Sequence, residues 1–318
     1  MLHVTNGDAV LAGFRAGHIP GEYLPWRDVL HDGPVPQRDS LEALSDVRAA
    51  YLAGTPEGPE YDAMRAGFAE RDRTLASFAA HDETVLWFEH DLYDQLQLLQ
   101  ILAWLGDHDW ARARPSIIQI GSHPEIQNFQ GLGELNGAQL AALFPTRIPI
   151  TSRQIEIGRE AWRAFCADEP TSLAALARRS DPEMPFLSAA LVRFLEEYPS
   201  VRDGLTRSER QLLMAIAAGT TKRKAVWFAS QQFETSWWGD LSIYDRLDAL
   251  TTGSQPLVER VDADHVALTE AGRRVLGGAE RRDLHDVERW LGGVHLGNGR
   301  PDWRWNEDRQ TVTVSLGE

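Results

Sequence analysis

The chain has 318 residues, which is long enough for two or three domains. Of these residues 43% are hydrophobic and 25% charged, which is the composition of a globular protein. Its 47 acidic residues outnumber its 32 lysines and arginines, and the formal net charge is -15. This charge disfavours nucleic-acid binding, because phosphates require a concentrated basic surface. The single cysteine, Cys166, excludes an internal disulfide and a cysteine-based zinc site.

The first residues, Met1–Thr5, lack the basic region and the apolar run of a signal peptide. No stretch of the chain approaches the roughly 20 apolar residues that are needed to cross a bilayer. We therefore expect a cytoplasmic protein that makes no contact with a membrane.

Residues 1–150 alternate short, apolar, β-rich runs with helical patterns. This alternation predicts an α/β domain with a mainly parallel, Rossmann-like sheet. After the third strand, apolar residues at helical spacing over 92–105 predict a long helix with one buried face. The predicted strands are Leu2–Thr5, Gly21–Leu24, Thr84–Phe88 and Ser116–Ile120.

Two further regions follow this domain. Residues 151–204 show a helical pattern interrupted by prolines, and we interpret them as a helical linker region. Residues 205–318 predict a winged-helix-like α+β domain that opens with a capping box of Thr206 and Glu209. Its predicted elements are helices at 207–218, 222–233, 242–250 and 270–276, a β-hairpin at 256–261 and 265–268, and a terminal β-hairpin.

Each predicted strand of the first domain is followed by polar, mostly ionisable side chains. In open α/β sheets ligands bind beyond the carboxyl ends of the strands, so these side chains are candidates for one common site. The candidates are Asn6, Gly7 and Asp8 after the first strand, Arg27, Asp28, His31 and Asp32 after the second, Glu89, His90, Asp91, Asp94 and Gln95 after the third, and Ser122 and His123 after the fourth.

We interpret five of these residues as catalytic and the others as ligand-binding. Glu89, His90 and Asp91 separate an apolar strand from an apolar helix, where charge is costly unless it is used or paired. Asp28 and His31 complete the catalytic set, and either histidine would serve as the acid/base group near neutral pH.

Structural roles stay open for several candidates. Asp8 is also suited to cap a helix that begins near Ala9, and Gly7 is suited to a tight turn. Asp28 and Asp32 are also typical of solvated loop acids.

Several carboxylates within a few ångströms cannot all stay ionised without a compensating positive charge. That charge could be a divalent metal, the guanidinium of Arg27 or Arg153, or a cationic substrate; alternatively one carboxyl keeps its proton and acts as a general acid. The chain has no His-Glu-x-x-His motif, calcium loop or Walker loop, and Gly131-Leu132-Gly133 does not follow the first strand. The cofactor therefore stays undetermined.

Three segments, at residues 5–8, 24–34 and 87–96, resemble the bacterial family of domain of unknown function 1835. The Trp-Phe-Glu-His-Asp segment at 87–91 is the most specific of them, and the resemblance extends to Gly204–Arg210. It covers most of the chain and places the important residues at the same strand ends. It implies no particular reaction.

The predicted winged helix invites a DNA-binding interpretation, which its charges disfavour. The helix in the recognition position carries Asp245 and Asp248, which would repel phosphates. The basic runs Lys222–Lys224 and Arg273–Arg274 are the only candidates for phosphate contacts. We therefore favour a docking role for this domain, toward a protein partner or within the chain.

The leading hypothesis is an enzyme, a hydrolase or group transferase, that acts on a small polar or phosphorylated substrate at the strand-end residues. A second hypothesis is a regulator in which the α/β domain senses a ligand and the winged helix relays the signal to DNA or a protein. In a third, the chain is an interaction scaffold and the acidic residues are structural.

Overall fold

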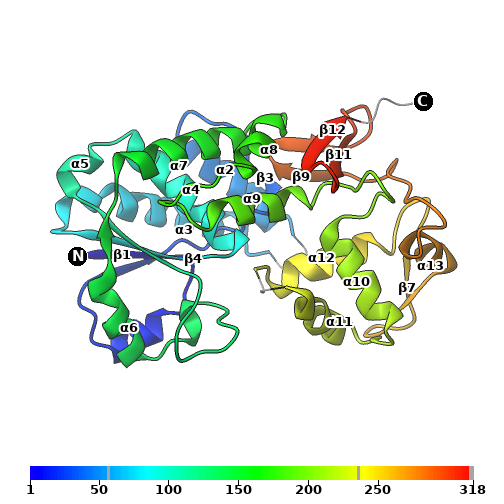
Figure 1. Cartoon of the computed structure of the whole chain (residues 1–318), viewed down its shortest axis with the longest axis horizontal. Helices are drawn as coiled ribbons and strands as arrows, with labels where there is room; N and C mark the ends of the chain where they lie inside the picture. The colour runs from blue at the N-terminus through cyan, green and yellow to red at the C-terminus, as the bar shows by residue number, and fades with distance from the viewer. Residues whose placement is uncertain (56–57, 235–236, 315–318) are drawn as a thin grey trace.

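A five-stranded sheet forms the centre of the N-terminal half (Figure 1). Its strands are β1 (Leu2–Thr5), β2 (Glu22–Pro25), β4 (Thr84–Glu89), β5 (Ser116–Ile120) and β6 (Ile148–Pro149). The computed structural model, which describes residues 1–55, 58–234 and 237–314, orders them β2-β1-β4-β5-β6. The first four are parallel and β6 is antiparallel, which confirms the predicted mainly parallel sheet.

Helices cover both faces of this sheet. On one face, α1 (Leu11–Ala16) and α6 (Gly137–Leu143) form a hydrophobic cluster with Val85 and Trp87 of β4. Leu86 and Phe88 point to the other face and join the main core. Because β4 is buried on both faces, its sequence is a continuous apolar run without alternation. The helices of that other face are α2 (Leu41–Ala53), α3 (Tyr61–Ala76), α4 (Leu92–Gly106) and α7 (Ser152–Phe165).

The helix after β4 is buried more deeply than its pattern predicts. The Asp91 side chain caps α4 by accepting a hydrogen bond from the Asp94 N–H over 2.9 Å. The helix lies between the sheet and α7, so Gln95, Gln97 and Gln100 are buried together with the apolar residues. The helix is therefore buried over more of its surface than the single face that its sequence pattern predicts.

The region predicted as a helical linker packs onto the N-terminal half. It contains α7, α8 (Thr171–Ala177) and α9 (Leu187–Leu195), and residues of all three belong to the main core. α7 begins at a capping box of Thr151 and Gln154. It packs extensively against α4. No helix within the described ranges is long and apolar enough to cross a membrane.

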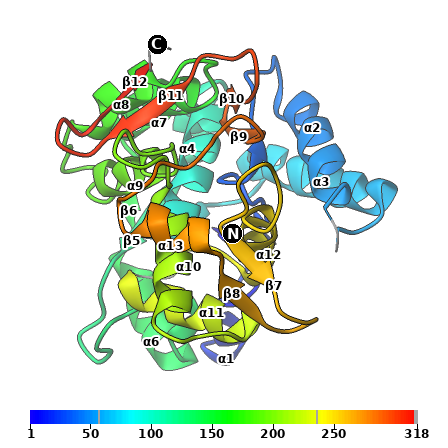
Figure 2. The same ribbon diagram turned by 90° about the vertical axis from the view of Figure 1, so that its right-hand side faces the viewer.

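The following part of the chain combines helices with a short antiparallel pair of strands (Figure 2). The capping box of Thr206 and Glu209 is present at the start of α10, as predicted. The elements are α10 (Arg207–Ala217), α11 (Arg223–Ser230), α12 (Asp240–Ala249), α13 (Glu270–Leu276), β7 (Val258–Arg260) and β8 (Val266–Leu268).

The last part of the chain returns to the N-terminal half. β9 (Arg289–Gly292) pairs in parallel with β3 (Gly33–Pro34) and antiparallel with β10 (Val294–Leu296). β11 (Trp303–Asn306) and β12 (Thr311–Val314) then form an antiparallel hairpin beside α8.

Candidate functional site

The topology of the sheet marks one place where a ligand site is expected. From β1 the chain crosses to β2 on one side, and the next strand of this sheet, β4, lies on the other side of β1. In open α/β sheets ligands bind at such a reversal, beyond the carboxyl ends of the strands. The loops after β1 and β4 meet there, because Asn6 Nδ2 donates a hydrogen bond to Asp94 Oδ2 over 2.7 Å.

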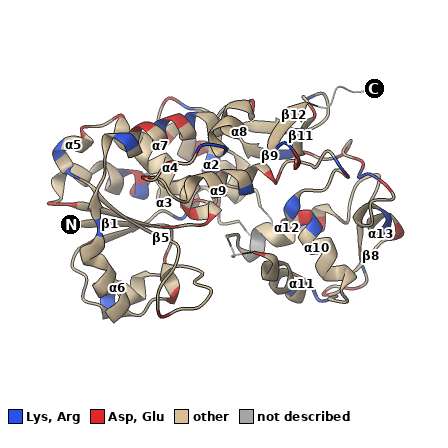
Figure 3. Ribbon diagram, in the orientation of Figure 1, with Lys and Arg blue, Asp and Glu red and all other residues tan. Residues whose placement is uncertain are grey.

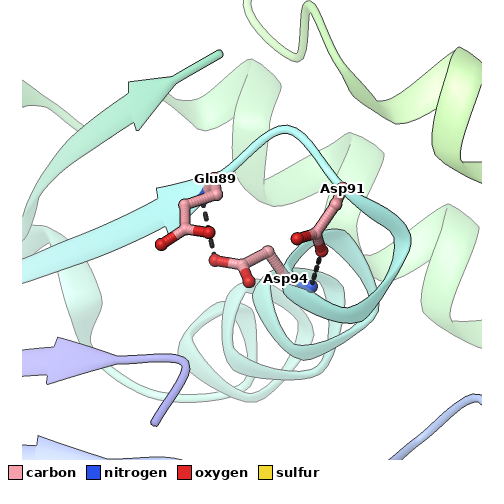
Figure 4. Close-up of side chains that lie close together, drawn as sticks. All are labelled: Glu89, Asp91 and Asp94. Carbon is pink, nitrogen blue, oxygen red and sulfur yellow. Dashed lines mark hydrogen bonds between the residues drawn. The ribbon is translucent and has the colours of Figure 1, made fainter. Parts of the chain in front are cut away.

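Three carboxylates gather at this point (Figure 4). Glu89 ends β4, Asp91 precedes α4 and Asp94 lies in its first turn; one oxygen of each lies within 4.8 Å of the others. The Glu89 N–H donates to Asp94 Oδ1 over 2.7 Å, so the strand-to-helix turn itself holds the cluster together. Glu89 and Asp94 are buried, and Asp91 is half-buried. These three residues are called the carboxylate cluster below.

Among the described residues, no positively charged side chain forms an ion pair with these three carboxylates. Burial and the neighbouring carboxylates Asp94 and Asp91 raise the pKa of Glu89 far above its usual range. Burial and Asp94 raise the pKa of Asp91, and burial raises that of Asp94 although hydrogen bonds from the Glu89 N–H and Asn6 oppose the change. Protons or a bound cation must therefore neutralise part of the cluster. Carboxylate oxygens alone suit a hard cation such as Mg²⁺, Mn²⁺ or Ca²⁺.

The loop that contains Gly131-Leu132-Gly133 completes the surroundings of the cluster. The Leu132 N–H donates a hydrogen bond to Glu89 Oε1 over 2.6 Å. A Cβ atom at Gly131 would lie 2.2 Å from Glu89 Oε2, so only glycine lets the carboxylate occupy this place. The Gly-Leu-Gly run at 131–133 was the available signal, but it follows β5 and gave no reason to join it to β4.

We expect the two glycines of the site to respond differently to alanine. Gly131→Ala should lower the free energy of unfolding by about 1–3 kcal/mol, since the new methyl group displaces the Glu89 carboxylate. At Gly7 nothing lies within 4 Å of an added Cβ, so Gly7→Ala should be neutral or stabilise by about 0.4–1 kcal/mol. Urea unfolding of both variants measures the difference, and equal effects would contradict it.

Asp8 and Arg27 form an exposed ion pair. Arg27 Nε donates to Asp8 Oδ2 over 2.6 Å, and the pair joins the loops after β1 and β2. The alternative in which Asp8 caps a helix is wrong, because α1 begins at Leu11 and no side chain of the described residues caps it. Arg27 adopts a left-handed backbone conformation, with φ of 55°, which is uncommon for a residue other than glycine.

The carboxylate of Asp28 has no exposed surface and is held by arginines. Arg48 Nε donates to Asp28 Oδ1 over 3.0 Å, and Arg71 Nη1 lies 3.7 Å from Oδ2. Through Arg48 and Arg71, the Asp28 carboxylate connects α2 and α3 to the loop after β2. The geometry therefore favours a structural role for Asp28 over the predicted catalytic one.

His31 and Asp32 lie where the N-terminal half meets the C-terminal part. The His31 ring stands edge-on to Trp237 and Tyr93, with centroid distances of 4.9 and 5.9 Å, and burial lowers its pKa. Neither of its ring nitrogens has a hydrogen-bond partner in the part of the chain that the structure describes. Asp32 lies 3.8 Å from Arg246 of α12 and lines a cavity of about 390 Å³ between the two parts.

The remaining candidates lie around β5 and α4. The half-buried His90 packs edge-on against Phe186, and burial lowers its pKa although a hydrogen bond with the Ile120 backbone opposes the change. Ser122 and His123 line a separate groove of about 560 Å³ along β5. Gln95 is buried, and its Nε2 donates to the Glu89 carbonyl over 2.6 Å, which positions the cluster.

A comparison with protein-family models finds no match to the chain, and a search of curated proteins finds no significantly similar sequence. Any assignment of function therefore rests on the geometry of the site. The predicted residues fall into separate groups, and of these the carboxylate cluster with Asn6 lies at the reversal of the sheet.

Proposed function

We propose that the chain is an enzyme, a hydrolase or group transferase, that acts on a small polar or phosphorylated substrate at the carboxylate cluster. A divalent cation would assist it. One observation carries the proposal: three mutually close carboxylates, which no cation of residues 1–55, 58–234 and 237–314 compensates, lie where the connections of the sheet reverse. The open space around Gly7 leaves room for a ligand beside the loop after β1.

The cluster suits catalysis on phosphate or carbonyl groups. Mg²⁺ is usually held by one or two carboxylates together with substrate phosphates. A cation bound by Glu89, Asp91 and Asp94 would neutralise their charge and polarise a substrate oxygen. Asn6 is held against Asp94 and would orient the substrate from the neighbouring loop.

Two further expectations belong to this proposal. The resemblance to the family of domain of unknown function 1835 is retained, since its most specific segment includes Glu89 and Asp91. A cytoplasmic location is retained as well, and it suits a cation and a small phosphorylated substrate.

Addition of Mg²⁺ or Mn²⁺ is expected to raise the melting temperature of the wild-type protein and not that of Glu89→Gln. A ligand at a hundred times its dissociation constant stabilises by about 2.7 kcal/mol, which a thermal-shift titration resolves. Without metal, Glu89→Gln should melt at the same or a higher temperature than wild type, because the raised pKa of Glu89 already favours its neutral form and the glutamine oxygen can still accept from the Leu132 N–H.

Glu259→Gln is the matched control, since Glu259 is an exposed residue of β7. It should keep the full response to metal. A metal response of equal size in wild type and Glu89→Gln, or none in wild type, would exclude the cluster as the cation site.

A second function, a ligand-sensing regulator, has one observation in its favour. His31 contacts both Tyr93, in the first turn of α4, and Trp237, so packed side chains connect the cluster with the C-terminal part. In that part, α10, α11 and α12 followed by the β7–β8 pair, with Lys222 bridged to His265, have the arrangement that we propose is a winged helix.

The charges of the proposed winged helix disfavour direct DNA binding. Acidic and basic residues lie side by side on α12 (Figure 3), and Asp248 pairs with Arg223 and Arg260 at 2.7 Å each. Of the predicted basic run this leaves Lys222 and Lys224 exposed. Salt-sensitive binding of duplex DNA that requires these two lysines would favour the regulator over the enzyme.

A further inference from the structure

A second cavity lies in the helical layer, lined by residues of α2, α3, α4 and α7. Its volume is about 580 Å³, which is in the range of sites for small organic ligands. The hydrogen bond from the Gln37 N–H to the Cys166 carbonyl, at 3.2 Å, joins the segment before α2 to the end of α7. None of Glu89, Asp91 and Asp94 lines this cavity, so it is distinct from the carboxylate cluster.

A buried amide whose N–H group has no acceptor among the described residues lies at the wall of this cavity. Gln100 lines the cavity and is 2% exposed. The indole N–H of Trp26 can only donate, and it donates to Gln100 Oε1 over 2.7 Å, which fixes the orientation of the amide. Gln100 Nε2 then has no acceptor among the described residues. Because an unsatisfied buried donor is costly, this nitrogen calls for an acceptor from a ligand.

Aromatic side chains form the apolar part of the cavity. Trp104 of α4 and Trp162 of α7 both line it and are half-buried. His108 stacks on Trp104 with a centroid distance of 3.8 Å and an interplanar angle of 23°. Such surfaces favour a flat ring as the body of the ligand.

The charged residues that line the cavity include four acids and three arginines. Three of its acids are already paired: Glu42 with Arg65, Asp72 with Arg71 and Asp107 with Arg159. Arg38 and Arg163 form no ion pair within the described ranges, and they face only one unpaired acid, Asp39.

The start of α2 contributes a partial positive charge at the cavity. This helix of 13 residues begins at the cavity, where Ser40 and Leu41 line the wall. The partial positive charge and free N–H groups of a helix N-terminus favour anions.

We propose that this cavity binds a small, flat aromatic anion. The amide of Gln100 would donate to an acceptor on the ring, and Trp104 and Trp162 would contact its faces. Arg38, Arg163 and the first turn of α2 would hold a phosphate or carboxylate at the mouth.

Isothermal titration calorimetry of the full chain tests the proposal with two probes, adenosine monophosphate and indole-3-acetate, which carry the two kinds of anionic group. Titrations contain EDTA, so that a metal-dependent phosphate site at the carboxylate cluster does not contribute. At least one probe should bind, and adenosine or inorganic phosphate alone should bind at least about tenfold more weakly, since each supplies half of the contacts.

Variants locate the binding. The double variant Arg38→Gln/Arg163→Gln should weaken binding of the probe about tenfold or more, because both charge-assisted contacts to its anionic group are lost. Both side chains are exposed, so their loss does not endanger folding. Gln100→Leu should weaken binding by a similar factor. Arg112→Gln, an exposed arginine of α5 (Trp110–Ala113), and Glu89→Gln should bind as wild type.

Binding of neither probe would overturn the proposal, as would binding that the arginine double variant leaves unchanged. Because Glu89→Gln keeps this site and removes the proposed cation site, failure here is distinguishable from failure of the proposed enzyme function.

Discussion

Replacing Arg48 by methionine is expected to lower the free energy of unfolding by about 3–5 kcal/mol. The Arg48 guanidinium is fully buried and donates to Asp28 Oδ1 as well as to the carbonyl oxygens of Val29 and Asp32, at 2.7 and 2.6 Å. Methionine fills a similar volume but leaves Asp28 as a buried charge, with Arg71 at 3.7 Å. Urea unfolding followed by circular dichroism measures the loss.

Two variants control this experiment. Arg65→Met removes an arginine that pairs with the exposed acids Glu42 and Asp46, and it should cost less than about 1 kcal/mol. Asp28→Leu combined with Arg48→Met removes both partners and should cost less than the sum of the single changes. If Arg48→Met and Arg65→Met prove equally mild, the buried pair does not hold the loop after β2.

Glu209→Gln is expected to destabilise the protein by about 3–5 kcal/mol near neutral pH. Glu209 is fully buried, pairs with Arg282, and accepts a hydrogen bond from Arg289 Nη2 over 2.6 Å. Its second role is the capping box of α10, in which Oε2 accepts from the Thr206 N–H over 3.0 Å. The variant leaves two arginines facing a neutral amide.

The effect of this substitution should depend on pH in a defined direction. Burial alone would raise the pKa of Glu209, but Arg282, Arg289 and Arg246 hold it far below its ordinary value of 4.5. The stabilisation is therefore present above pH 4.5 and is lost as the pH falls toward the lowered pKa. The difference between wild type and Glu209→Gln should shrink in that acidic range.

Glu270→Gln provides the control for Glu209. Glu270 is highly exposed and pairs with Arg274 one helical turn away, so its loss should change stability by less than about 0.5 kcal/mol at any pH. Unfolding free energies measured across the acidic range decide the question. A constant difference between wild type and Glu209→Gln would show that the arginines do not stabilise the charged form.

Local sequence patterns were sufficient to predict many of the secondary-structure elements. β5 has its predicted bounds, because a short apolar run rich in β-branched residues, with Pro115 before it and Gly121 after it, is typical of a strand. The start of α10 was readable from Thr206 and Glu209, since both hydrogen bonds of a capping box join residues three positions apart.

The site was predictable in part. Parallel strands end at one edge of a sheet, and this rule located Glu89, Asp91 and Asp94 together. The same rule grouped Asp28 and His31 with them, although Asp28 is engaged by Arg48 and His31 packs against Trp237. Those two partners come from α2 and from the distant C-terminal part.

The sequence alone determined the four parallel strands of the central sheet, the mainly parallel type of that sheet and the acidic turn at 89–94, since each of these depends on neighbouring residues or on a repeating pattern. Tertiary structure decided which acids are neutralised by an arginine and which are left without one. It also brought the N–H of Leu132 to Glu89 across 43 positions. Charge compensation acts through space between segments whose proximity no local pattern records, so only the folded chain separates a structural carboxylate such as Asp28 from the carboxylate cluster.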